Sequence, residues 1–205
     1  MNTLQIRSYN TEFNTENDSR TIHGLAIPVN SQSEYLRDLE GSYYEVILPS
    51  AMDGLIENND IKVYLDHDPS QGTYARSKYG VGSLRLYVTE RGLEFDFDAP
   101  ETVFGDSLLE GIKRGDYDAM SFAFYQGEDD WGVNETGQDI HYIRSFNKVT
   151  EISILSLQPA YSSTEVERRS LEEYQSRKVN NAMTKINELE ESLNNLYKKY
   201  LDIEY

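Results

Sequence analysis

The pattern of apolar residues changes once along the chain, at Arg168 and Arg169. Before this point the sequence contains short apolar runs with period-two alternation, separated by turn residues, which is typical of β-strands. From Ser170 to Tyr205 there is no glycine and no proline, and apolar residues recur at spacings of three and four. We therefore predict two regions, a β-rich domain over residues 1–169 and a helical tail over residues 170–205.

The predicted tail carries a narrow apolar seam. Its members are Val179, Ala182, Ile186, Leu189, Leu193, Leu196, Tyr200 and Ile203. This a/d pattern lasts for nearly four heptads, which is typical of a coiled coil. A single amphipathic helix that folds back on its own domain is the alternative. We favour self-association or a helical partner, because the rest of the helix is polar, and we expect a homo-oligomer formed through the tail.

The pattern over residues 1–169 predicts a mainly β domain with flanking helices, which is an α+β fold. The expected strands are Ile22–Val29, Tyr43–Leu48, Ile61–Leu65, Ser83–Thr89, Leu93–Ala99, Tyr117–Tyr125, Ile140–Phe146 and Val149–Leu157. Short helices are expected from Pro49 and over Thr102–Arg114, where Gly115 follows the second helix. So many strands with two helices favour a closed or nearly closed β-barrel. The polar segments Asn10–Asp18 and Gly127–Gly137 are expected to be exposed loops.

Composition excludes several classes of function. The chain has 36 acidic and 19 basic residues, a formal net charge of −17, which argues against binding nucleic acid phosphates. It has no cysteine, so a disulfide framework, a thiolate metal site and a cysteine nucleophile are excluded. No apolar run approaches the ~20 residues that span a bilayer, and the first residues lack the pattern of a secretory signal. We expect no membrane contact and no cofactor.

His67 is the histidine most suited to chemistry. It follows the strand pattern Ile-Lys-Val-Tyr-Leu, and alternation places it on the apolar face with Val63 and Leu65, next to a turn. An imidazole at such a position could be oriented by burial and still reach a cleft, or it could be a core histidine bonded to backbone. His23 and His141 read as ordinary strand residues.

Two further polar residues lie inside apolar strands. Ser121 alternates with Met120 and Phe122, and a serine hydroxyl acts as a nucleophile only with an adjacent base that is itself oriented by an acceptor. Glu151 lies before Ile152, and a carboxylate in an apolar strand needs a partner. The histidine could supply that partner.

An arginine could satisfy the same carboxylate in a structural ion pair. The candidates are Arg76, Arg85 and Arg144. A metal site on Asp66, His67 and Asp68 is a further alternative. Alternation points both aspartates away from the histidine, and no second histidine lies nearby at ligand spacing, so we expect no metal.

Read in order, these segments resemble the prohead proteases of tailed bacteriophages, which share a fold and serine chemistry with herpesvirus assemblins. The matching pieces include His-Gly-Leu-Ala-Ile-Pro-Val at 23–29, Val-Tyr-Leu-Asp-His-Asp at 63–68, Gly-Asp-Tyr-Asp-Ala-Met-Ser-Phe-Ala-Phe at 115–124, and Thr-Glu-Ile-Ser-Ile-Leu-Ser-Leu-Gln-Pro-Ala-Tyr at 150–161. The resemblance covers about residues 20–168. It implies an assemblin-like β-barrel followed here by the coiled-coil tail.

The resemblance also implies the roles of the candidate residues. It places the catalytic histidine on His67, the nucleophile on Ser121 and the third member on Glu151, with His141 as the competing third member. The implied activity is a serine endopeptidase that cleaves the major capsid protein or scaffold protein, with self-cleavage left open, inside the assembling procapsid in the host cytoplasm. The alternative is a catalytically inert β-rich scaffold or capsid assembly component that acts through its coiled-coil tail.

Overall fold

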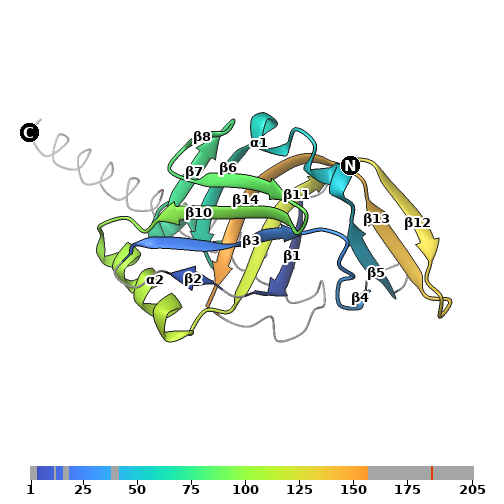
Figure 1. The fold of residues 1–205 in the computed structure, drawn as a ribbon, viewed down its shortest axis with the longest axis horizontal. Coiled ribbons are helices and arrows are strands. Elements are labelled where there is room, and N and C mark those ends of the chain that lie inside the picture. Colours follow the sequence, from blue (N-terminus) through green and yellow to red (C-terminus); the bar gives the residue numbers. More distant parts are fainter. Residues whose placement is uncertain (1–3, 12, 16–18, 38–41, 157–185, 187–205) are drawn as a thin grey trace, which may run out of the picture. The chain divides into compact units, whose positions relative to one another are not determined.

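The computed structural model describes residues 4–11, 13–15, 19–37, 42–156 and 186. Strands dominate these residues and form three sheets, which confirms the prediction of a mainly β domain with few helices (Figure 1). Among the described residues, no helix combines the length and the apolar character needed to cross a membrane.

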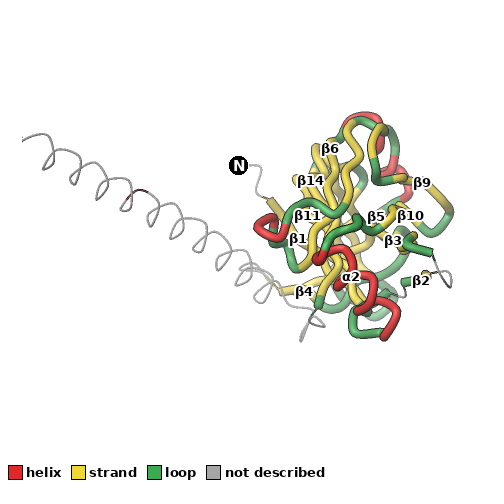
Figure 2. The backbone as a smooth tube through the Cα atoms, turned by 90° about the vertical axis from the view of Figure 1, so that its left-hand side faces the viewer, coloured by secondary structure: helices red, strands yellow, loops and turns green. Residues whose placement is uncertain are grey.

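The largest sheet has six strands in the order β1-β11-β14-β6-β7-β8. Their bounds are β1 Leu4–Asn10, β6 Asp60–Leu65, β7 Ala75–Lys78, β8 Val81–Gly82, β11 Ala119–Gln126 and β14 Phe146–Leu155. β11 runs antiparallel to both of its neighbours, whereas β14 and β6 are parallel. Figure 2 shows β6, β14, β11 and β1 side by side. This sheet carries all three candidate segments.

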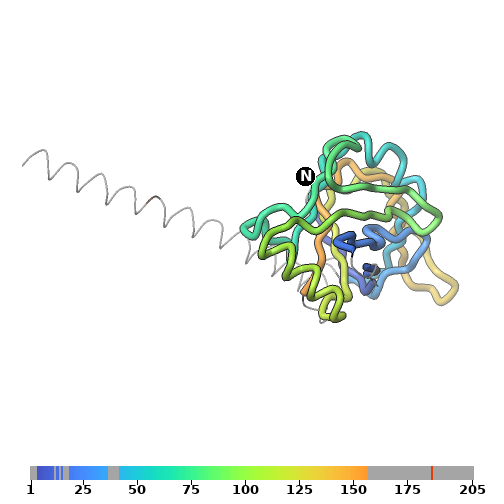
Figure 3. Tube along the Cα trace, turned by 60° about the vertical axis from the view of Figure 1, so that its left-hand side comes forward, coloured from blue at the N-terminus to red at the C-terminus, as the bar shows by residue number. Residues whose placement is uncertain are grey.

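Two four-stranded sheets complete the described fold. One has the order β2-β3-β10-β9, with β2 Asn14–Thr15, β3 Thr21–Pro28, β9 Arg85–Thr89 and β10 Gly92–Asp98. The other has the order β12-β13-β5-β4, with β4 Leu36–Arg37, β5 Ser42–Ile47, β12 Asp129–Val133 and β13 Asp139–Ile143. β3 and β10 cross in front of β11 and β14 (Figure 1; blue and green strands in Figure 3).

The hydrophobic core joins the apolar faces of these sheets. Its fully buried members include Ile22, Ile27, Phe95, Phe97, Met120, Phe122, Phe124, Ile152 and Ile154. Since Met120, Phe122 and Phe124 belong to this core, alternation along β11 sends Ser121 to the opposite face of the sheet. The same alternation along β14 sends Glu151 to that opposite face.

Four short helical segments connect the strands: η1 Pro49–Met52, α1 Leu55–Asn58, η2 Pro69–Gln71 and α2 Val103–Arg114. α2 agrees closely with the prediction. The Gly105 N–H donates to Thr102 Oγ1 over 3.1 Å, which caps the first turn, and Gly115 ends the helix in the left-handed conformation.

Several expectations differ from the structure. The barrel prediction is wrong, because each described sheet is open, with edge strands β1 and β8, β2 and β9, or β12 and β4. The number of strands does not determine how they pair. β13 pairs in parallel with β5 in a separate sheet and does not extend the largest sheet. The predicted loop Gly127–Gly137 contains strand β12, which forms a hairpin with β13. Apart from Ile186, the predicted tail lies outside the described residues.

Candidate active site

His67 lies in a tight turn directly after β6, so the strand alternation used to place its side chain does not extend to it. Asp66 and His67 have φ angles of 51° and 57°, and the Asp68 N–H donates to the Leu65 carbonyl over 2.9 Å. Two consecutive residues with positive φ, closed by this bond, are typical of a type I′ turn. The chain leaves β6 opposite Ile154 of β14, and the turn brings the imidazole back to Glu151.

Ser121 lies near the start of β11, between β1 and β14. In the antiparallel register it is paired with Ser153 of β14, while Ala123 is paired with Glu151. The serine and the carboxylate therefore occupy the same face of adjacent strands. Ser121 is 0% exposed.

The three candidate residues converge on the imidazole of His67. Its Nε2 lies 2.8 Å from Ser121 Oγ, and its Nδ1 lies 2.5 Å from Glu151 Oε1. An ionised carboxylate can only accept, so Nδ1 carries the proton in this contact and Nε2 of the neutral ring is an acceptor. The His67 and Glu151 side chains are only 11% and 18% exposed, which shields the pair from solvent.

The Ser121 hydroxyl has a second acceptor. Its Oγ also donates to the backbone carbonyl of Arg7 on β1, over 3.0 Å. With neutral His67, two acceptors lie within reach of one hydroxyl proton. Rotation about the Cβ–Oγ bond moves that proton from Arg7 O to Nε2 without displacing the oxygen.

None of the three arginines weighed as partners for Glu151 forms an ion pair with it. Arg76 pairs with Asp60, Arg85 pairs with Asp96 and Asp98, and Arg144 pairs with Asp130. The Glu151 carboxylate makes the short contact with His67 and a long one with Ser153 Oγ, at 3.5 Å.

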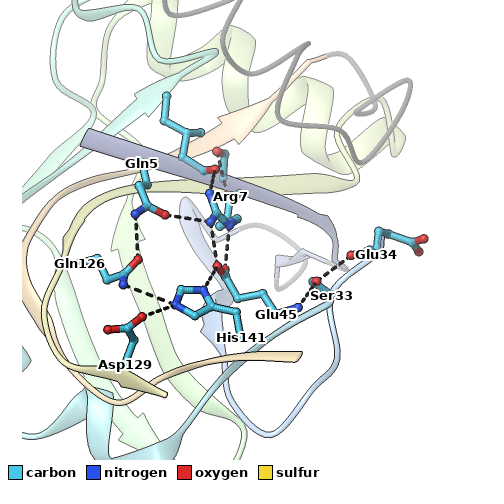
Figure 4. Close-up of polar contacts among 10 residues, drawn as sticks. Gln5, Arg7, Ser33, Glu34, Glu45, Gln126, Asp129 and His141 are labelled. Atoms are coloured by element: carbon cyan, nitrogen blue, oxygen red, sulfur yellow. Dashed lines mark hydrogen bonds and ion pairs between the residues drawn. The ribbon is translucent and has the colours of Figure 1, made fainter. Parts of the chain in front are cut away.

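His141 belongs to a different buried cluster, which joins β1 to the sheet of β5 and β13 (Figure 4). Arg7 donates through Nε and Nη2 to the two carboxylate oxygens of Glu45, each over 2.7 Å. His141 contacts Glu45 through Nδ1 at 3.3 Å and Asp129 through Nε2 at 2.8 Å. The structure therefore brings Glu151, and not His141, to His67.

Opposing effects set the charge state of this cluster. Burial alone would raise the pKa of the Glu45 carboxyl, but the Arg7 charge and the hydrogen bonds from His141 and Arg7 hold that pKa below its usual range. Burial likewise acts to lower the pKa of His141, and its bonds to Glu45 and Asp129 raise it above the usual value. The cluster therefore favours a charged arginine, carboxylate and imidazolium.

We predicted no role for Arg7 or Glu45 from the sequence. A single arginine near the start of the chain carries no local signal, since its importance comes from Glu45, 38 residues away. The strand that holds it, β1, was not predicted either. Only the pairing of β1 with β11 places the Arg7 carbonyl beside Ser121.

Asp66 and Asp68 have separate local partners. The Asp66 carboxylate accepts from the N–H and hydroxyl of Ser156, and Asp68 accepts from the Ser70 N–H. The described part of the chain contains no group of three or more histidine and acidic side chains placed to hold a metal ion.

A cleft of about 950 Å³ lies away from the converging residues. It is lined by the end of β1 and by β3, β9 and β10, and includes His23, Arg91 and Asp96. β3 and β10 pack against the core face of β11, whereas Ser121 points to the opposite face. The cleft and the converging residues are therefore separate features.

A carboxylate, an imidazole and a serine hydroxyl bonded in this order form the arrangement used by serine hydrolases. Comparison of the sequence with known families gives the same class: the profile of the caudovirus prohead serine proteases matches residues 4–177. The chain belongs to this family of serine peptidases.

The structure is similar to that of the bacteriophage T4 capsid assembly protease, gp21, with a TM-score of 0.48 and 10% sequence identity. The similarity covers 74% of this chain and 96% of that one. No curated protein sequence matches the chain.

Proposed function

We propose that the chain is a capsid-maturation endopeptidase in which Ser121 is the nucleophile, His67 the general base and Glu151 the orienting carboxylate. The observation that carries this proposal is the imidazole of His67, which contacts Ser121 Oγ at 2.8 Å and Glu151 Oε1 at 2.5 Å. Family membership supports capsid or scaffold proteins as substrates and the procapsid in the host cytoplasm as the place of action.

The proposed reaction begins when the Ser121 proton turns from the Arg7 carbonyl to His67 Nε2. Ser121 Oγ then attacks the scissile carbonyl carbon while Nε2 takes the proton, and Glu151 stabilises the resulting imidazolium. The imidazolium protonates the leaving amine, the peptide C–N bond breaks, and an acyl-enzyme forms. Water activated by His67 attacks the ester, which releases the acid product and restores the serine.

The buried state of Ser121 adds a requirement. Because the residue is 0% exposed, a peptide carbonyl can reach Oγ only after a neighbouring segment moves. We propose that binding of the substrate segment itself supplies the free energy for this movement.

The test is co-expression with the major capsid protein of the same phage, followed by intact-mass measurement of every product. We expect defined cuts with the wild type and none with Ser121→Ala. Ser77→Ala is the matched control, because Ser77 is a buried serine on β7 of the same sheet. Its hydroxyl has no hydrogen-bond partner among the described residues. Identical masses from the wild type and Ser121→Ala, with shells assembled, would instead support the inert scaffold component.

We also propose that residues 170–205 recruit the protease to the shell through their heptad seam. Deletion of this segment is expected to leave cleavage of a peptide substrate intact and to reduce incorporation into procapsids. Packaging of the truncated chain at the wild-type level would contradict this role.

A further inference from the structure

We propose that Asp66 is a positioning residue for the active site, because its carboxylate fastens the His67 turn to the end of β14. The inference rests on the proposed function, since it assigns to Asp66 the placement of the catalytic base. Asp66 itself does not touch the reacting atoms.

The turn that holds His67 needs support. A left-handed backbone conformation is unfavourable for residues other than glycine, and here it occurs at two consecutive residues, Asp66 and His67. Aspartate tolerates this conformation better than most residues. The bond between the Asp68 N–H and the Leu65 carbonyl closes the turn but does not connect it to the rest of the site.

Asp66 supplies that connection through three hydrogen bonds to one strand end. Its carboxylate accepts from the Ser156 N–H over 2.7 Å and from the Ser156 hydroxyl over 2.6 Å. Its own N–H donates to the carbonyl of Ile154 over 2.9 Å. Hydrogen bonds to an ionised carboxylate are stronger than those between neutral groups.

The strand that Asp66 holds is the strand that carries Glu151. The residue before His67 and the carboxylate that contacts His67 are thus fixed to the same segment, β14. A movement of the turn by about 1 Å would lengthen both the Glu151 contact and the Ser121 contact. Misplacement on that scale typically costs about 10²-fold in rate.

Asp68, on the other side of His67, provides an internal comparison. Its carboxylate accepts from the Ser70 N–H over 2.9 Å and from Gln71 Nε2 over 3.5 Å, which caps the helical segment η2. The two aspartates flank the same histidine, and these bonds join the Asp66 carboxylate to the end of β14 and the Asp68 carboxylate to η2. A role in positioning should therefore appear at Asp66 and not at Asp68.

The experiment uses the full chain and a peptide that spans a cleavage site mapped on the capsid protein. Asp66→Gly removes the carboxylate and leaves a residue that adopts the left-handed conformation without strain. We expect kcat to fall about tenfold to hundredfold while KM changes less than twofold. Asp68→Gly, the matched control, should lower kcat less than threefold.

Two further variants separate positioning from general loosening of the turn. Asp66→Asn keeps an acceptor for the Ser156 N–H and an amide that can donate to the Ser156 hydroxyl, so we expect kcat within about threefold of the wild type. Ser156→Ala removes one of the two donors and should give an intermediate loss. The double variant Asp66→Gly/Ser156→Ala should be no slower than Asp66→Gly, because both changes break one connection.

A structural readout completes the test. In a crystal structure of Asp66→Gly we expect the distance between His67 Nδ1 and Glu151 Oε1 to exceed 3.5 Å. An unchanged distance, or equal losses of kcat in Asp66→Gly and Asp68→Gly, would overturn the positioning role while Ser121→Ala remained inactive. Cleavage by Ser121→Ala would instead overturn the proposed function, so the two failures are distinguishable.

Discussion

Replacing Glu151 by glutamine would test how the charge beside His67 contributes to catalysis. Glutamine has nearly the same shape and keeps an oxygen that can accept from His67 Nδ1, so the contact at 2.5 Å can be retained while the negative charge is lost. We expect the variant to fold normally, because glutamine preserves the volume of the side chain and the acceptor that contacts His67 Nδ1.

The expected loss follows from the charge that develops on the imidazole. When His67 takes the Ser121 proton, an imidazolium forms beside the carboxylate, and because each charge is spread over its group we take the separation of the two charge centres as about 4 Å. Such a pair contributes about 4 kcal/mol at an effective dielectric constant of about 20. At 1.36 kcal/mol per factor of ten, kcat should fall about 10³-fold. The amide can also stabilise the wrong tautomer of His67, which extends the loss to about 10⁴-fold.

The assay is the steady-state cleavage of the mapped peptide, with kcat and KM measured separately. KM should change less than threefold, since Glu151 contacts His67 and not the substrate. Asp129→Asn is the matched control. It also removes a carboxylate bonded to a histidine nitrogen, at 2.8 Å from His141 Nε2, but in the cluster of Figure 4. Its kcat should stay within threefold of the wild type.

A fall in kcat of less than tenfold in Glu151→Gln would refute the reasoning. It would show that the negative charge of Glu151 does not assist the proton transfer to His67. A large loss in Asp129→Asn with a small one in Glu151→Gln would make His141 the third member of the site.

Three other predictions concern the buried cluster and the chemistry of the site. Burial acts to lower the pKa of His141, but the bonds to Glu45 and Asp129 outweigh it and the pKa is raised. The stability that the charged imidazolium contributes is therefore fully present below about pH 6.5 and is lost as pH rises through the folded-state pKa. The difference in free energy of unfolding between the wild type and His141→Gln, measured with urea, should therefore be larger at pH 5.5 than at pH 8.5, and an equal difference would contradict the assignment. Arg7→Met removes the guanidinium that donates two hydrogen bonds to the buried Glu45 carboxylate and should cost about 3–5 kcal/mol of unfolding free energy, whereas Arg76→Met, which breaks an exposed pair, should cost much less. Equal costs would show that burial does not govern the difference. Cleavage of the peptide should continue in excess EDTA, and an activity that is lost to the chelator and restored by a divalent cation would favour the metal alternative.

Much of the local structure was predictable because its causes are local. The alternation of Met120 and Phe122 around Ser121 identifies a strand with one core face, and the structure has β11 at that place. Thr102 and Gly115 mark the two ends of α2 because a side-chain cap and a left-handed residue satisfy helix ends wherever they occur. The prediction failed at β12, whose exposed residues lack the alternation of a half-buried strand.

The closure of the sheets was not predictable in the same way. Strand content alone suggested a barrel, but closure depends on which edges pair. β13 pairs with β5, and the paired residues Ile140 and Tyr44 are 140 − 44 = 96 positions apart in the chain. Register between distant strands is set by the whole packed core.

The sequence by itself determined which residues could do chemistry: a histidine after a strand, and a serine and a glutamate within apolar strands. The role of His67, Ser121 and Glu151 as a catalytic unit stays a prediction until the substitutions are measured. Tertiary structure decided that these three side chains meet and that His141 contacts Glu45 instead. It also decided that the Arg7 carbonyl accepts a hydrogen bond from the Ser121 hydroxyl. The reason is physical. The type of each residue is written in the sequence, and the face it occupies along a strand follows from alternation with its neighbours. The contact of 2.8 Å between His67 and Ser121 depends instead on sheet order, on strand register and on one left-handed turn.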